Sequence, residues 1–353
     1  MTSMLTWEWY TGNLDWLRHS TIFLARSGSH AYGTNLPTSD EDYRGVCIPP
    51  KRFFHGFHDH FEQTVLNEPY DVTIFDIRKF FKLTADSNPN MIEMLFVDES
   101  DWLIATGAWR AIYDQRQRFV TKKAMHTFSG YAMSQLKRIH THRNWLLNPP
   151  AKHPERSDYN LPDAPTLERE QFGVIEARIK KTEDVLGGEG FTKDKVGEVD
   201  PGLVAGVVAD MNLSPNLIEV IVNERRYNVA MRNWAQYQQW KEGRNAARAE
   251  LEARFGYDTK HAMHLVRLMR MAVEILERGE VIVKRPDAQE LLDIRRGAWT
   301  FYQLMDWAAD TEAKLDEVYS RSDLPHAANY NGLSALCAGV VEQHLGYPYL
   351  GPG

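Results

Sequence analysis

The stretch SGSHAYGTNLPTSDEDYRGV, residues 27–46, decides the expected fold of this 353-residue chain. An apolar run, Thr21–Ala25, comes just before it and is expected to form a buried strand. A second strand is expected at Tyr43–Ile48, directly after three acidic positions. Because glycine, proline and small polar residues fill the space between, we expect a turn-rich connection joining two neighbouring strands.

Two pairs of residues in this stretch carry the expected chemistry. Side chains alternate along a strand, so Asp40 and Asp42 are expected to point to the same side. Two carboxylates on one side repel each other unless a positive charge lies between them, and oxygen ligands with phosphate favour Mg²⁺. Gly28 lets the backbone approach a ligand closely, and Ser29 offers a hydroxyl and an N–H to phosphate oxygens. A phosphate cradle followed by a metal-binding pair predicts a nucleotidyl-transfer site.

This layout resembles the signature of the DNA polymerase β-like nucleotidyltransferases, in which Gly-Ser is followed downstream by Asp-x-Asp. Residues 28–46 are closest to the predicted nucleotidyltransferases of the RNA-repair-associated, polymerase β-like type, found in bacteria and their phages. The segments 76–96, 257–279, 284–287 and 292–297 also resemble this family. A Gly-Ser or an Asp-x-Asp alone is common in proteins, so the resemblance depends on their combination.

The resemblance implies an α+β fold, with a small mixed sheet and helices as the catalytic core and an α-helical region after it. It also implies that Asp40 and Asp42 hold two Mg²⁺ ions, with Mn²⁺ as the alternative, and that a third carboxylate comes from the next strand. Asp71 is the first choice, because it starts the expected strand Asp71–Phe75. Asp76 faces the other way and is the second choice. The alternative for Asp71 is a structural role as a cap at the strand entry.

A second informative stretch, residues 257–279, is expected to be a helix that Asp258 caps and a glycine ends. The expected buried stripe consists of Ala262, Leu265, Val266, Met269, Ala272, Val273 and Leu276. On another face, Lys260, His264 and Arg267 follow at i, i+4 and i+7 and are expected to bind nucleotide phosphates. The alternative is that they form ion pairs with acidic residues of the catalytic region.

Five prolines among polar residues in Asn148–Pro165 predict a linker. We expect it to separate a nucleotidyltransferase domain, residues 1–148, from a mainly α-helical domain, residues 149–353, that lines the substrate cleft. Residues 109–147 are expected to be helical with an interruption at Gly130. A glycine-rich segment, residues 187–202, is expected to be a loop.

The histidine-rich segments do not have the spacing of a zinc site. His55, His58 and His60 lack helical spacing, and we expect a loop beside the active site there. His140 and His142 are two residues apart, so on a helix they do not share a face.

The formal net charge of −7 argues against a nucleic-acid-binding coat over the whole surface. Two segments are locally basic, however. Residues 115–143 contain seven Lys or Arg and no acid, and residues 225–270 contain ten against four acids. Such patches suit a polyanion such as a nucleotide or RNA. The alternative is that they are solvated helix faces.

The remaining composition predicts a cytoplasmic protein with no membrane partner. The two cysteines lie in apolar runs and form no disulfide or metal framework. The first twenty residues lack a basic start followed by an apolar core, so no signal peptide is expected, and no apolar run approaches the roughly 20 residues of a membrane span.

Three functions remain as hypotheses. The first is transfer of a nucleotide from an NTP to an RNA end, which rests on the family analogy. The second is nucleotidyl transfer to a protein or a small molecule, against which the basic patches weigh. The third is a non-catalytic nucleotide- or RNA-binding protein, against which the intact Gly-Ser, Asp-x-Asp and third aspartate weigh.

Overall fold

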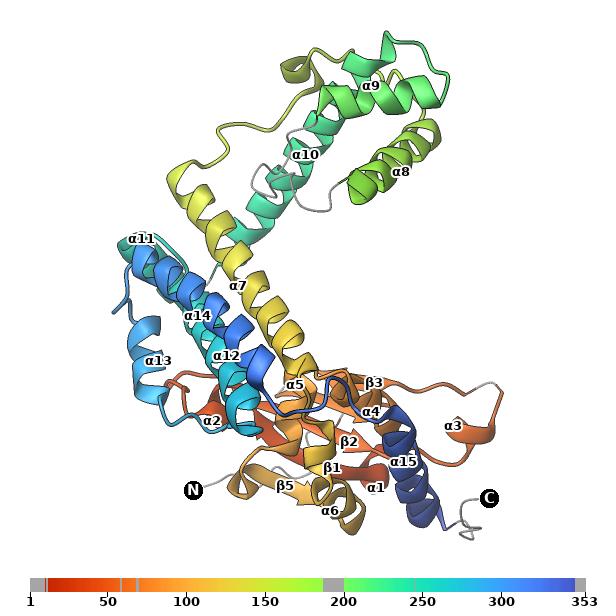
Figure 1. The fold of residues 1–353 in the computed structure, drawn as a ribbon, viewed down its shortest axis with the longest axis vertical. Coiled ribbons are helices and arrows are strands. Elements are labelled where there is room, and N and C mark those ends of the chain that lie inside the picture. The colour runs from red at the N-terminus through yellow and green to blue at the C-terminus, as the bar shows by residue number, and fades with distance from the viewer. Residues whose placement is uncertain are drawn as a thin grey trace. The chain divides into compact units, whose positions relative to one another are not determined.

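The computed structural model describes residues 10, 12–57, 59–67, 70–186, 200–244 and 246–346. The chain forms two compact units: the first contains residues 1–143 and 251–353, and the second contains residues 144–250 (Figure 1). The first division point lies near the boundary expected at residue 148. The chain then returns to the first unit, so helices after residue 250 share a unit with the sheet. The assignment of separate functions to residues 1–148 and 149–353 stays a prediction.

A five-stranded mixed sheet lies at the centre of the first unit, with the strand order β3-β4-β2-β1-β5. The strands are β1 (Thr21–Ser27), β2 (Asp42–Cys47), β3 (Gln63–Leu66), β4 (Asp71–Asp76) and β5 (Trp102–Ala105). β2 and β4 are parallel, and the other neighbours are antiparallel. The α+β fold class is therefore confirmed. Because β2 begins at Asp42, Asp40 lies before the strand, and strand alternation does not place it.

The two faces of the sheet pack against different cores, as alternation along a strand requires. Val46 of β2 and Phe75 of β4 belong to the main core of the unit. Tyr43 and Val72, which are paired across the same two strands, belong to a smaller core on the other face. Because side chains alternate, Asp42 and Arg44 of β2 lie on the same face as Val46, and Asp71 and Thr73 of β4 lie on the same face as Phe75.

The first unit also contains helices from before and after the second unit. They are α1 (Leu17–Ser20), α2 (Gly28–Tyr32), α3 (Arg52–His55), α4 (Ile77–Ala85), α5 (Pro89–Ile92), α6 (Gly107–Tyr113), α12 (Thr259–Arg278), α13 (Ala288–Arg295), α14 (Phe301–Arg321) and α15 (Tyr330–Leu345), with 3-10 turns at Glu93–Leu95, Glu99–Asp101 and Arg116–Phe119. Two further helices, α7 (Lys123–Leu147) and α11 (Ala246–Phe255), each cross the division between the units. The interruption expected at Gly130 is wrong, because α7 continues through this residue.

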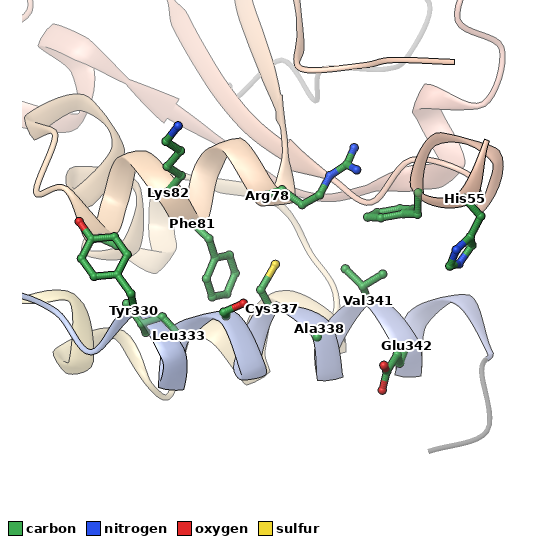
Figure 2. A pocket seen from close by; sticks show the side chains of 13 residues that line it. His55, Arg78, Phe81, Lys82, Tyr330, Leu333, Cys337, Ala338, Val341 and Glu342 are labelled. Carbon is green, nitrogen blue, oxygen red and sulfur yellow. The ribbon is translucent and has the colours of Figure 1, made fainter. Parts of the chain in front are cut away.

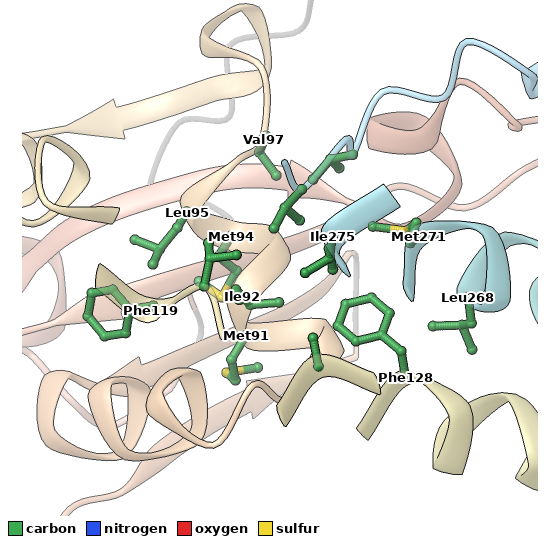
Figure 3. Close-up of a cluster of buried hydrophobic side chains, with 14 of the residues drawn as sticks. Met91, Ile92, Met94, Leu95, Val97, Phe119, Phe128, Leu268, Met271 and Ile275 are labelled. Atoms are coloured by element: carbon green, nitrogen blue, oxygen red, sulfur yellow. The ribbon is translucent and has the colours of Figure 1, made fainter. Parts of the chain in front are cut away.

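The helix α12 joins the late part of the chain to the core of the first unit. All seven residues of its predicted stripe are buried, and Asp258 caps it by accepting a hydrogen bond from the backbone N–H of His261 at 3.1 Å. Gly279, at φ 67°, ends it. Figure 3 shows Met271 and Ile275 of α12 in one apolar cluster with Phe128 of α7. The buried apolar side chains of α12 therefore pack within the main core of the first unit, together with α7.

In its described residues, 144–186, 200–244 and 246–250, the second unit has three helices packed around a small core of its own. They are α8 (Arg169–Leu186), α9 (Pro201–Asp210) and α10 (Leu217–Glu242). The core consists of Ile175, Ile179, Val204, Val207, Val208, Ile221 and Val222. The predicted linker has no α-helix and contains one 3-10 turn, Arg156–Tyr159. Of the glycine-rich loop expected at 187–202, residues 187–199 lie outside the described residues, and Pro201 already begins α9.

Several smaller expectations can also be compared with the structure. Trp16 packs edge-on against Phe61, with ring centroids 5.0 Å apart, and has a packing role. Cys47 and Cys337 are buried free cysteines. His58 lies outside the described residues. In the described part of the chain, no helix combines the length and apolar character needed to cross a membrane.

Candidate active site

Asp42 and Asp71 begin the two parallel strands at the centre of the candidate site. They are direct partners in the β2–β4 ladder, and Ser27 at the end of β1 pairs with Asp42 from its other side. Directly paired residues in neighbouring strands carry their side chains on the same face. The two carboxylates therefore lie side by side on the main-core face, where the strands end at solvent. Asp71 is exposed and Asp42 is half-buried.

Burial and four charged side chains determine the electrostatics around Asp42. Burial, followed by the charge of Asp71, raises the pKa of Asp42 above its ordinary value of 3.8. Arg44 and Lys260 lower it, and the exposed Asp40 raises it further. Since the net shift is upward, the two cations do not compensate the cost of ionising Asp42. The hard oxygen donors and the uncompensated negative charge fit a divalent ion such as Mg²⁺.

The three aspartates are grouped more loosely than we expected. In the described residues, one group of at least three His, Cys, Asp or Glu has ligand atoms all within 4.8 Å of one another, and it lies elsewhere. Asp40, Asp42 and Asp71 therefore lie near one edge of the sheet, but their carboxylate oxygens are not all within 4.8 Å of one another. Like charges keep carboxylates apart when no cation lies between them.

The raised pKa of Asp42 predicts how stability depends on pH in metal-free protein. Its folded-state pKa lies above the unfolded value, so the folded protein binds this proton more tightly. This contribution is fully present below the ordinary value of 3.8 and is lost as the pH rises through the raised pKa. We expect Asp42→Asn to remove the loss, which urea unfolding of both proteins between pH 3.5 and 7 in chelator would measure. Equal pH slopes for the two proteins would contradict the prediction.

Gly28 brings the backbone into contact with the carboxylate of Asp42. It has φ +62°, and a Cβ added there would lie 2.3 Å from Oδ2 of Asp42. Ser29 follows it in the short helix α2 and is half-buried. The Gly-Ser pair is therefore adjacent to the paired aspartates, and only glycine satisfies both the backbone conformation and the space at residue 28.

Gly28→Ala is expected to lower both stability and transfer activity. A non-glycine residue in the left-handed region costs about 1–3 kcal/mol, and here the new methyl group also displaces Asp42. Gly33→Ala is the matched control, because Gly33 has φ +73° but its added Cβ would meet only Ala288 at 3.7 Å. Urea unfolding and transfer assays should show a similar stability loss for both variants but a loss of activity for Gly28→Ala alone. Equal activity losses would show that the contact with Asp42 does not matter.

The three residues predicted on one face of α12 have different environments. Lys260 is exposed and is close enough to Asp42 to lower its pKa. Burial, aided by the charges of Arg267 and Lys260, lowers the pKa of His264 to about 3. His264 is therefore neutral at pH 7 and offers a hydrogen bond instead of a positive charge. Lys260 is the member of the three that the structure places next to the aspartates.

Arg267 is buried in an ion pair, which was the alternative considered for this face. Its Nη1 donates to Oε1 of Glu93 at 2.6 Å, and its guanidinium lies 3.8 Å from the ring centroid of Tyr32. The Tyr32 hydroxyl donates to the other oxygen of Glu93 at 2.6 Å. Because Tyr32 ends α2, Arg267 supports the helix that carries the Gly-Ser pair.

Two further residues, one carboxylate and one cation, complete the description of the site. Asp76, the second choice for the third acid, is buried, caps α4 and accepts from Nη2 of Arg78 at 2.7 Å, so it has a structural role. Arg44 was missed by the sequence reasoning. Its signal was its position two residues after Asp42, which puts both side chains on one face of β2.

A cavity of about 670 Å³ lies away from this site, between α4 and α15 (Figure 2). Its walls include Phe81 and Lys82 of α4 and Leu333 and Cys337 of α15. None of the predicted site residues lines it. The candidate active site is therefore an open edge of the sheet and not this apolar cavity.

Several residues of the two basic segments are engaged in ion pairs. Arg225 pairs with Glu176 and Glu183, and Arg270 pairs with Asp287 and Glu290. Lys137 and Arg138 of α7 are exposed. In the first segment, Lys123 pairs with Asp86. Ion pairs therefore neutralise part of the charge of each segment, and exposed positive charge remains on α7, as the alternative of solvated helix faces also predicts.

Comparisons with known proteins relate the first part of this chain to one family. Residues 14–147, which include all three aspartates, match the family model described as "RlaP: RNA repair pathway DNA polymerase beta family". The resemblance to polymerase β-like nucleotidyltransferases of the RNA-repair type is thereby confirmed for this region. The later helix α12 lies outside the matched residues.

Two curated relatives extend this likeness. The "Uncharacterized 38.9 kDa protein in nrdC-mobD intergenic region" of Enterobacteria phage T4 is 26% identical over 336 residues, which is 86% of this chain and 94% of the relative. The "Uncharacterized protein YcgL" of Bacillus subtilis (strain 168) is 31% identical over 81 residues, 22% of this chain and 30% of the relative. No solved structure matches the chain.

Proposed function

We propose, with the family match of residues 14–147 as the premise, that this chain is a metal-dependent nucleotidyltransferase that transfers a nucleotide from an NTP to an RNA end. The observation that carries the proposal is the in-register pair Asp42–Asp71, which lies against the backbone of Gly28. A structural carboxylate pair would be expected to have compensating cations, whereas here the pKa of Asp42 is raised.

Asp40, Asp42 and Asp71 are the residues that would hold two Mg²⁺ ions, or Mn²⁺ in their place. When bound, these ions neutralise charge on the triphosphate and lower the pKa of an acceptor hydroxyl. The residues around them position the substrate. The backbone at Gly28 and Ser29 contacts the phosphates, and Lys260 adds positive charge from α12.

In the proposed reaction, the acceptor oxygen attacks the α-phosphorus of the NTP and pyrophosphate leaves. We assign the role of proton acceptor to Asp71, because it is exposed while its partner Asp42 is half-buried. The proton of the acceptor hydroxyl would pass to the Asp71 carboxylate as the new phosphodiester bond forms.

RNA is the proposed acceptor for two reasons. The family description names an RNA repair pathway, and α7 exposes Lys137 and Arg138 in the unit that carries the aspartates.

The buried free cysteines favour a reducing compartment such as the cytoplasm as the location of the protein.

The experiment is transfer from α-labelled NTPs in Mg²⁺, with the four NTPs tested separately on tRNA, on nicked and intact RNA, and on total protein. Label on RNA that disappears in Asp71→Asn would support the proposal. Label on protein or on a small molecule would support the second hypothesis instead. No label on any acceptor, with NTP or RNA binding retained, would favour a non-catalytic binder and overturn the proposal.

A further inference from the structure

His142, Asp258 and His261 come together where the first turn of α12 meets α7. In the part of the chain that the structure describes, this is the one group of at least three His, Cys, Asp or Glu residues whose ligand atoms all lie within 4.8 Å of one another. All three belong to the first compact unit. Local sequence spacing gave no indication of the group, because His142 is more than 100 positions before Asp258 and His261. The other histidine of the pair on α7, His140, does not belong to the group and packs against Phe301, with ring centroids 5.4 Å apart.

The distances within the group differ from those of ordinary His–Asp hydrogen bonds. Oδ2 of Asp258 lies 3.5 Å from Nδ1 of His142 and 3.5 Å from Nε2 of His261. A charge-assisted N–H···O bond would be about 2.7–2.9 Å long. Ligands bonded at about 2.0–2.1 Å to one tetrahedral ion lie about 3.3 Å from each other. The observed spacing is thus closer to that of ligands around a shared ion.

The carboxylate of Asp258 is also held in a fixed orientation. Its other oxygen, Oδ1, accepts the capping hydrogen bond from the backbone N–H of His261 at 3.1 Å. This leaves Oδ2 directed at the two imidazoles, as in metal sites whose carboxylate ligands are oriented by a further hydrogen bond. The imidazole rings have centroids 5.7 Å apart and planes inclined at 47°.

Burial favours an ion at this place. The side chain of Asp258 has no exposed area, and those of His142 and His261 are 16% and 13% exposed. A cation bound at Oδ2 would lower the cost of keeping this buried carboxylate ionised. The two partly exposed histidines would give the ion access to solvent.

We propose that His142, Asp258 and His261 bind one divalent transition-metal ion of the Zn²⁺ class. Two imidazole nitrogens and one carboxylate oxygen are a donor set that suits Zn²⁺, whereas Mg²⁺ and Ca²⁺ prefer oxygen ligands. Three protein ligands leave the fourth position of a tetrahedral site for water. The ion would tie the first turn of α12 to α7, and that turn carries Lys260, one of the two cations that lower the pKa of Asp42. The site is separate from the aspartates and uses none of them.

The test is metal binding by the full-length, tag-free protein after removal of metals by a chelator. We expect one Zn²⁺ per chain in competition with a chromophoric chelator. Co²⁺ should give the intense visible absorption of a tetrahedral site, which Zn²⁺ but not excess Mg²⁺ abolishes. Binding well below one ion per chain, or a Co²⁺ spectrum of octahedral type, would overturn the proposal without recourse to any variant.

Variants locate the ion. His142→Gln, His261→Gln and Asp258→Asn should each weaken Zn²⁺ binding by more than the roughly 10–100-fold cost of losing an outer-shell partner. Asparagine still caps a helix, so Asp258→Asn should remain folded. His140→Gln, on the same helix, and Asp42→Asn, in the candidate active site, should bind Zn²⁺ like the unaltered protein. Equal weakening by His140→Gln, or loss of the ion in Asp42→Asn, would refute this location. Because the readout is binding, failure here is distinguishable from failure of the proposed transferase activity.

Discussion

Asp42→Asn is expected to reduce nucleotidyl transfer by at least about 10²-fold, the loss typical when one group that stabilises transition-state charge is removed. The substitution keeps the shape of the side chain and removes its negative charge. Its effect on stability should have the opposite sign, because burial and Asp71 already raise the pKa of Asp42 and make its ionised form unfavourable. We therefore expect metal-free Asp42→Asn to be more resistant to urea than the unaltered protein at pH 7.

Two comparisons make this expectation specific to the site. Asp310→Asn changes an exposed aspartate of α14 and should leave both transfer and stability unchanged. Asp71→Asn should lose transfer about as strongly as Asp42→Asn, and the double variant little more, because residues that act as a unit are not additive. Full transfer by Asp42→Asn in saturating Mg²⁺ would refute the assignment of this carboxylate. A loss of transfer accompanied by a loss of stability would point to misfolding instead.

Glu93→Gln is expected to destabilise the protein by about 3–5 kcal/mol, the cost of leaving a buried charge without its partner. Glu93 and Arg267 are each 5% exposed, and the carboxylate also accepts the hydroxyl of Tyr32. Glutamine keeps the size of the side chain but cannot compensate the guanidinium. Urea unfolding at pH 7, followed by circular dichroism, measures the change.

Two controls separate the buried charge from an ordinary loss of contacts. Glu99→Gln removes the exposed partner of Arg110 and should change the free energy of unfolding little, because an exposed ion pair contributes little. Removing both charges, with Glu93→Leu and Arg267→Met together, should cost less than Glu93→Gln alone, because no unpaired ion remains. If Glu93→Gln costs no more than Glu99→Gln, the pair contributes nothing beyond a surface ion pair.

The elements of the fold that could be predicted are those with a strong local pattern. The β-branched run at Asp71–Asp76 and the apolar run at the start of β1 became strands, and the 3.6-residue stripe of α12 is buried as expected. Gly130 was overestimated as a helix breaker. One glycine costs about 1 kcal/mol in a helix, and the burial of Phe128 and Ala132 on either side outweighs it.

Long-range packing explains what could not be predicted. The partner of Arg267 is 174 positions away in the sequence, so no local pattern distinguishes an ion pair from a phosphate ligand. The return of the chain to the first unit after residue 250 also depends on contacts between distant segments. In the site, the resemblance pointed to Asp71 at the start of the next strand, and the parallel register of β2 and β4 pairs it with Asp42. The alternation expected to align Asp40 with Asp42 does not apply, because Asp40 lies before β2.

The order of segments along the chain has a consequence for synthesis on the ribosome. Residues 144–250 are translated after the sheet and before α12, although α12 completes the core around the sheet. At about 5–20 residues per second, this interval lasts on the order of 5–20 s. During it, nascent chains present Met91, Ile92 and Phe128 without the helix that later covers them (Figure 3). We expect molecular chaperones to bind the growing polypeptide in this window and to leave once α12 has emerged.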